Sequence, residues 1–223
     1  MATSIKVYLI FYLALTLCYM FVKTGDNFKL RVANKVTLSL MFSFFGVYNI
    51  AKAGFPDSAS ILFAVMLIFA TVGDILLLWD FVKGGAFFGT GNLLLALYNI
   101  MYMGKKGLNI GDYWFFILFF TFLWGSMAVM ANTGRLPLRK MRVPFCGYLI
   151  TVTLHASLSI AGLFLLHDLR SILLFSGSIM FMISDYLLAF YDFKYKDKKW
   201  ITRMNTLLYF PGLMLIALTT MWV

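Results

Sequence analysis

The feature that most constrains this chain is a succession of eight apolar runs, each about as long as a membrane-spanning helix. A helix needs ~20 mostly apolar residues to cross the hydrocarbon core of a bilayer. The breaks between the runs are short and rich in turn-forming residues, such as Gly54-Phe55-Pro56-Asp57 and Gly84-Gly85. The predicted helices span residues 5–22, 33–50, 59–79, 84–103, 112–131, 143–165, 170–190 and 201–221.

Composition favours lipid over water as the solvent of this chain. Hydrophobic residues make up 62% of the sequence and charged residues 13%, whereas soluble domains hold ~45–50% and ~25%. One soluble core of 223 residues cannot hide so much apolar surface. We therefore expect an all-α integral membrane protein, with residues 1–223 forming a single transmembrane domain in a bacterial plasma membrane or the endoplasmic reticulum. The first run has no small-residue cleavage site, so we expect it to be retained as a helix.

The net charge of +10 has a clear distribution along the chain. Of the 19 Lys and Arg residues, 14 lie in the breaks after the first, third, fifth and seventh runs or within the first three residues of the run that follows. The positive-inside rule puts these breaks in the cytoplasm, and both termini then lie on the non-cytoplasmic side. Basic residues at helix ends favour contact with anionic membrane lipid, and we expect no binding of nucleic acid.

Two aspartates, Asp74 and Asp185, lie inside predicted spans. An ionisable group within a span costs at least ~2.5–3.5 kcal/mol on insertion scales, so it is usually kept for function or paired inside the bundle. At ~1.5 Å per residue, Asp74 lies ~9 Å from Asp80 and Asp185 lies ~10 Å from Asp192, where the two helices leave the membrane on the cytoplasmic side. The matched depth predicts that both carboxyl groups serve one site. A purely structural role, with Asp74 paired to Lys35, is the alternative.

The third and seventh predicted helices show a weak sequence similarity to each other. Gly73-Asp74 and an apolar stretch lead to Asp80-Phe81, and Ser184-Asp185 leads in the same way to Asp192-Phe193. The two helices are four apart and run in the same direction, which is typical of a four-plus-four repeat. Chance explains the similarity equally well, because helix ends drawn from few residue types look alike.

Other predicted helices carry polar side chains at the level of the two aspartates. Lipid offers no hydrogen-bond partners, so these side chains should turn inward and line a cavity open to the cytoplasm. The alternative is that these polar side chains only form hydrogen bonds that hold neighbouring helices together. His155 lies deeper and is expected to be a hydrogen-bonded core residue. No metal site or cofactor is expected. The polar residues are Lys35, Ser39, Ser43, Asn92, Asn99, Tyr148, Thr151, His155, Ser159, Asn205 and Tyr209.

These residues resemble the motifs of the YhhN, or lysoplasmalogenase, family. Lys35 matches a lysine that opens the family's second helix. The other matching segments are Gly73-Asp74 with its apolar tail, Gly84 to Tyr98, Ser184-Asp185-Tyr186-Leu187-Leu188-Ala189, and Tyr209 with Leu215 to Thr219. Two positions depart from the family pattern: Asn92 stands where relatives carry His, and Leu213 where they carry Gln.

The resemblance implies an eight-helix membrane protein that hydrolyses the vinyl ether bond of lysoplasmalogen, giving a fatty aldehyde and a glycerophosphoalcohol. One carboxyl group would protonate the alkene and the other would stabilise the cation, as in glycoside hydrolysis. The implied catalytic residues are Asp74 and Asp185, and which of them is the acid stays open. The residues expected to bind the lysophospholipid are Lys35, Asn92, Tyr148, Asn205 and Tyr209, with support from Ser39, Thr151, His155 and Ser184. A proton-relaying transporter and a non-catalytic lipid-binding protein are the alternatives.

Overall fold

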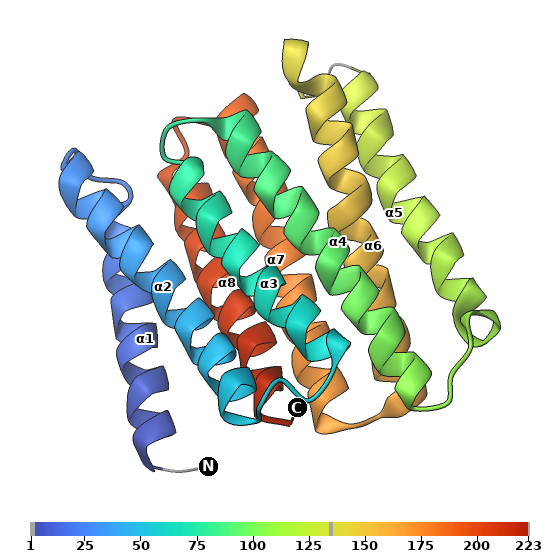
Figure 1. Cartoon of the computed structure of the whole chain (residues 1–223). Helices are drawn as coiled ribbons and strands as arrows, with labels where there is room; N and C mark the ends of the chain where they lie inside the picture. The colour runs from blue at the N-terminus through green and yellow to red at the C-terminus, as the bar shows by residue number, and fades with distance from the viewer. Residues whose placement is uncertain (1–2, 134–135, 223) are drawn as a thin grey trace.

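The computed structural model describes residues 3–133 and 136–222. This part of the chain forms eight α-helices and three short 3-10 helices, of which the last follows α8 (Figure 1). The helices are α1 (Thr3–Val22), α2 (Phe28–Lys52), α3 (Ser58–Leu76), α4 (Phe81–Lys105), α5 (Trp114–Asn132), α6 (Arg142–Leu166), α7 (Leu169–Phe193) and α8 (Lys199–Leu218). The prediction of an all-α bundle of eight helices is confirmed.

Membrane character follows from the same helices. Seven of them in the described ranges are long and apolar enough to span a membrane, and α2 is the exception. The first two turns of α2 carry Lys29, Arg31 and Lys35, which make it more polar than the others. Large apolar side chains such as Ile10, Phe44 and Phe122 stand exposed on the outer surface, where lipid would cover them. The chain is therefore a multi-pass membrane protein.

Capping side chains decide where several helices begin. Asn27 accepts a hydrogen bond from the backbone N–H of Leu30, so α2 begins five residues before its predicted start. Asp80 accepts from the N–H groups of Val82 and Lys83, so α4 begins at Phe81. The turn expected at Gly84-Gly85 is therefore wrong, because the cap brings both glycines into the first turns of α4.

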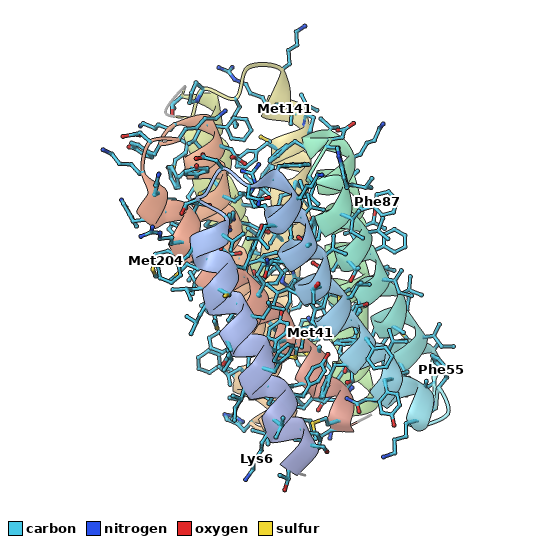
Figure 2. All side chains as sticks on the ribbon, turned by 90° about the vertical axis from the view of Figure 1, so that its left-hand side faces the viewer. Lys6, Met41, Phe55, Phe87, Met141 and Met204 are labelled. Carbon is cyan, nitrogen blue, oxygen red and sulfur yellow. The ribbon has the colours of Figure 1, made fainter. Side chains whose placement is uncertain are left out.

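The loops divide the bundle into two ends. Both termini lie at one end, together with the loops that follow α2, α4 and α6, and we call this the terminal end (Figure 1). The loops that follow α1, α3, α5 and α7 lie at the opposite end, which we call the cavity end. In Figure 2, Lys6 and Phe55 mark the terminal end and Met141 marks the cavity end. That the cavity end faces the cytoplasm stays a prediction.

Helices α7 and α8 approach each other more closely than side chains would allow. A Cβ atom at Gly177 would lie 2.6 Å from the carbonyl oxygen of Gly212, and one at Gly212 would lie 3.0 Å from that of Gly177. Such backbone contact needs glycine on both helices. It holds the two helices that carry Asp185 and Asn205 in one register.

Substitution of Gly177 by Ala is expected to destabilise the protein by about 1–3 kcal/mol, because the methyl group must push α7 from α8. Thermal unfolding of the purified protein in detergent measures the effect as a lower Tm. Gly125→Ala on α5 is the matched control, since no atom lies within 4 Å of an added Cβ there. Equal melting temperatures for the two variants would contradict the close packing of α7 on α8.

Candidate active site

A cavity of about 640 Å³ lies at the cavity end of the bundle, surrounded by all the helices except α5. Its polar lining comes from distant parts of the chain, which only the folded bundle brings together. The main polar lining residues are Tyr19, Lys23, Arg31, Lys35, Asp74, Tyr148, Asp185, Asp192, Asn205 and Tyr209. Six of the residues singled out in the sequence are among them: Lys35, Asp74, Tyr148, Asp185, Asn205 and Tyr209.

Asp74 is held against α2 by two contacts. Its Oδ1 lies 3.1 Å from Nζ of Lys35, and its Oδ2 accepts a hydrogen bond of 2.6 Å from the hydroxyl of Ser39. Lys35 and Ser39 are one helical turn apart on the same face of α2. Only 1% of Asp74 is exposed. A buried carboxylate with a cation and a hydroxyl beside it can remain negatively charged.

Asp185 has different surroundings. Its Oδ2 accepts a hydrogen bond from the phenol of Tyr148 on α6, and none of the described residues forms an ion pair with it. Asp185 lines the cavity, and within the described residues its Oδ1 accepts no hydrogen bond. The two aspartates thus share one cavity but are not equivalent, because one has an ammonium partner and the other a neutral donor.

Asn205 joins three segments at the side of the cavity. Its Oδ1 accepts a hydrogen bond of 2.5 Å from Nζ of Lys23, and its Nδ2 donates one of 2.8 Å to the carbonyl oxygen of Ser184. The amide therefore ties the end of α1 to α7 immediately before Asp185. The Ser184 hydroxyl bonds back to the carbonyl of Phe181 and so supports the helix rather than the carboxyl group.

Tyr209 offers a polar group to the cavity. Its hydroxyl is buried and has no hydrogen-bond partner within the described part of the chain. Its ring is fixed by Phe88, Phe181 and Phe210, whose centroids lie 4.9–6.1 Å away. A rigid ring with a free hydroxyl can orient a bound molecule.

Five of the predicted site residues do not line the cavity: Ser39, Asn92, Thr151, His155 and Ser184. Ser39 acts from behind, through its bond to Asp74. Asn92 is buried and its Nδ2 has no partner in the described ranges. The Thr151 hydroxyl bonds to the carbonyl of Tyr148 and steadies that turn of α6.

His155 is fully buried, as expected of a core residue. Neither ring nitrogen has a hydrogen bond of good geometry among the residues described, so the expected hydrogen bonding of His155 stays a prediction. The ring packs on Phe181 at 5.8 Å between centroids, where the neighbouring surface is apolar.

Lys23, Arg31 and Asp192 line the cavity but were not predicted as site residues, because in the sequence they stand as charges at helix ends. Their spacing from predicted site residues in the sequence could have identified Arg31 and Asp192. Arg31 lies four residues before Lys35 on α2, and Asp192 lies seven after Asp185 on α7, so each shares a helix face with a recognised residue. Nothing local indicates Lys23, whose partner Asn205 is 182 residues away.

Three basic residues, Lys23, Arg31 and Lys35, line the cavity. Lys23 directly follows α1, and burial together with the positive charge of Lys35 lowers the pKa of Lys23 to about 7. Arg31 lies one turn before Lys35. Three basic side chains on one wall can bind an anion such as a phosphate group.

The apolar part of the cavity runs along α4 and α6. Val82 and Leu93 line it and are also 48% and 43% exposed on the outer surface of the bundle. Added Cβ atoms at Gly85 and Gly147 would meet nothing within 4 Å. This side therefore provides open, apolar space beside the lipid-facing surface. The apolar lining residues here are Phe81, Val82, Gly85, Ala86, Gly89, Leu93, Pro144 and Gly147.

Comparison with known proteins places the chain in a family. No curated protein matches it significantly, and no solved structure does. The model of the YhhN family matches residues 30–220, which include almost all of α2 and the whole of α3 to α8. The match contains both aspartates and most of the cavity lining. The chain belongs to the YhhN family.

Proposed function

We propose that this protein is a membrane-embedded hydrolase that cleaves the vinyl ether bond of a lysoplasmalogen. The observation that carries the proposal is the pair of unequal carboxyl groups in one cavity. Acid-catalysed vinyl ether hydrolysis needs a proton donor and an anion, and different surroundings can give two carboxyl groups these two roles. Membership of the YhhN family supports the same assignment.

The contacts suggest which aspartate is the acid. Asp74 faces the ammonium of Lys35, so it is assigned as the anion. Asp185 faces the phenol of Tyr148 through Oδ2, so it is assigned as the donor, with its proton on Oδ1. Tyr148 is then a positioning residue that fixes the direction of the Asp185 carboxyl group.

The reaction follows from these roles. Asp185 transfers its proton to the alkene carbon remote from the ether oxygen, and the ether oxygen donates its lone pair to give an oxocarbenium ion. The carboxylate of Asp74 stabilises this cation. Water adds to the cationic carbon and loses a proton to Asp185, which restores the acid. In the resulting hemiacetal the hydroxyl proton passes to the glycerol oxygen as the bond between that oxygen and the former alkene carbon breaks, which releases a fatty aldehyde and the glycerophosphoalcohol.

The remaining lining of the cavity suits the two ends of such a substrate. Lys23, Arg31 and Lys35 would bind the headgroup phosphate, and Asn205 would hold Lys23 in place. The alkenyl chain would lie along the apolar side between α4 and α6. A lipid could enter there without leaving the membrane, because that side adjoins exposed apolar residues.

Substrate binding is expected to weaken as the pH rises through about 7, since Lys23 loses its positive charge near that value. The sign follows from a lowered lysine pKa: the ammonium is present below about 7 and absent above it. Its neighbours Lys35, Asp192 and Asp74 set the local field. Losing one charge-assisted hydrogen bond raises KM by about tenfold.

Steady-state kinetics between about pH 6 and pH 8.5 measure this effect, a range in which unperturbed lysines keep their charge. The Lys23→Arg variant is the control, because a guanidinium stays charged throughout and should flatten the profile. A wild-type KM that stays constant over this range would contradict the role of Lys23.

Aldehyde release by the purified protein tests the proposed function. The substrate is a lysoplasmalogen, and the matched control lipid carries a saturated ether of the same chain length. The saturated ether has no alkene to protonate, so we expect aldehyde from the vinyl ether alone. Absence of aldehyde from both lipids would refute the proposed hydrolysis.

A second candidate function is proton-coupled transport. Buried polar side chains continue beyond the cavity towards the terminal end, where Asn92, His155 and Asn99 have nitrogen atoms without partners in the part of the chain described. Polar groups at such depth are typical of proton relays. Lysolipid-dependent proton flux into liposomes, without aldehyde release, would favour this function over hydrolysis.

A further inference from the structure

A second cavity, of about 550 Å³, lies at the terminal end of the bundle. It is bounded by the start of α3, the end of α4, the start of α7 and Trp222, and it shares no lining residue with the first cavity. The proposed hydrolysis makes no use of it. Its charged and aromatic lining nevertheless has the character of a binding site.

Two carboxylates in this cavity are already engaged by the protein. Asp57 caps α3 by accepting from the N–H of Ser60, and Asp168 caps α7 by accepting from the N–H of Ser171, each at 2.7 Å. Asp57 also forms an ion pair with Lys105. The N-termini of two helices therefore converge on the cavity, and helix N-termini favour anions.

Arg170 is the cation that the carboxylates leave unpaired. Within the described residues it forms no ion pair, and its Nε has no hydrogen-bond partner. Its guanidinium lies 4.5 Å from the ring centroid of Tyr102 and 5.4 Å from that of Tyr98. Nη1 donates to the carbonyl oxygen of Trp222 at 3.2 Å. Cation–π contact with two rings holds the guanidinium in place beside the cavity, where it can donate to an acceptor.

Tyr98 gives a second, independent indication of a ligand. It is 1% exposed, it lines the cavity, and its hydroxyl has no partner among the described residues. Buried hydroxyl groups nearly always have a hydrogen-bond partner in folded proteins. The Tyr98 hydroxyl and the Arg170 guanidinium are adjacent donors on one wall.

Lys106 adds a positive charge at the rim. Its Nζ lies 5.7 Å from the ring centroid of Tyr102 and 3.8 Å from Oδ2 of Asp168. About half of its side chain is exposed, so the ammonium can turn towards a bound anion. Three cations against two capping carboxylates leave the cavity with an excess of positive charge.

We propose that the cavity at the terminal end binds a phosphate group, through the guanidinium of Arg170, the hydroxyl of Tyr98 and the ammonium of Lys106. Arginine pairs with phosphate oxygens through two parallel hydrogen bonds, which its fork geometry favours. The cavity lies where the helices end, at the level of lipid headgroups if the helices span the bilayer. The phosphate can therefore belong to a lipid headgroup or be free in solution.

Binding of two probes to the full-length protein in detergent tests the proposal and separates the two sources. One probe is inorganic phosphate, followed by isothermal titration calorimetry, and the other is phosphatidic acid, followed by native mass spectrometry. Arg170→Gln is expected to weaken binding of whichever probe the wild type binds by about tenfold or more. This is the size expected for one charge-assisted hydrogen bond. Aldehyde release should be unchanged, because Arg170 lines the cavity at the terminal end and does not line the first cavity.

Arg203→Gln is the matched control, since Arg203 also lies over an aromatic ring, that of Phe21, at the opposite end of the bundle. It should bind both probes as the wild type does. Tyr98→Phe and Lys106→Gln keep the test valid if Arg170→Gln does not fold, and each should weaken binding. Binding of phosphate identifies a free anion, and binding of phosphatidic acid alone identifies a lipid. Failure of the wild type to bind either probe, or equal binding by wild type, Arg170→Gln and Tyr98→Phe, would overturn the proposal.

Discussion

Replacement of Asp185 by Asn is expected to lower kcat for lysoplasmalogen hydrolysis by about 10²–10⁴-fold, the usual contribution of a positioned general acid. The amide has the shape of the carboxyl group but has no acidic proton to give to the alkene. Tyr148 can still donate its hydrogen bond to the amide oxygen, so the packing of α6 on α7 should persist. The rate of aldehyde release from purified protein measures the effect.

Asp192→Asn is the matched control for this variant. Asp192 lines the same cavity seven residues further along α7, and the mechanism gives it no proton to transfer. It should keep most of its activity. A loss of less than about tenfold in Asp185→Asn would remove Asp185 as the general acid, and an equal loss in both variants would point to a general effect of charge.

Replacement of Lys35 by Met is expected to destabilise the fold by about 3–5 kcal/mol, the typical cost of leaving one member of a buried ion pair unpaired. The pair is well buried, with 14% of the Lys35 side chain and 1% of the Asp74 side chain exposed. Methionine keeps the length of the apolar stem, so the loss reports chiefly on the charge. Thermal unfolding in detergent measures the change.

The double variant Lys35→Met with Asp74→Asn separates charge from packing. Because it removes both charges, it should recover a large part of the lost stability while remaining inactive. Lys52→Met, at the other end of α2, is the control for loss of an exposed lysine. If Lys35→Met melted at the same temperature as Lys52→Met, Asp74 would not depend on Lys35 for its charge.

The Lys35–Asp74 pair also bears on the two roles of Asp74, functional and structural, between which the sequence did not decide. The structural reading predicted an ion pair with Lys35, and that pair is present. The functional reading predicted a place beside a cavity, and Asp74 lines one. The two readings are compatible, because a carboxylate that must stay ionised in a membrane needs a nearby cation.

The four-plus-four repeat stays a prediction, although the packing is compatible with it. The aspartates of α3 and α7 line the same cavity. Each of these helices packs extensively on the next helix in the chain, α3 on α4 and α7 on α8. The contacts of the two aspartates differ, so any ancestral symmetry does not extend to their chemistry.

The sequence alone determined the properties that belong to a single helix. Helix number, approximate helix length and the depth of Asp74 and Asp185 all follow from apolar runs of fixed rise. The inward placement of Lys35, Tyr148, Asn205 and Tyr209 also follows, because lipid offers no partner to a polar side chain. The eight helices and the place of these residues at one cavity agree with that reasoning.

Which polar groups meet one another became known only from the packing of the helices. Lys23 bonds to Asn205, which is 182 residues away, and Asp74 bonds to Ser39, which is 35 residues away on another helix. Such contacts depend on how each helix is rotated and how closely it approaches its neighbours, and the contact between Gly177 and Gly212 sets one such approach. An apolar run shows that a helix crosses the membrane, but it does not show which neighbour each face packs against, since lipid and protein interiors are equally apolar.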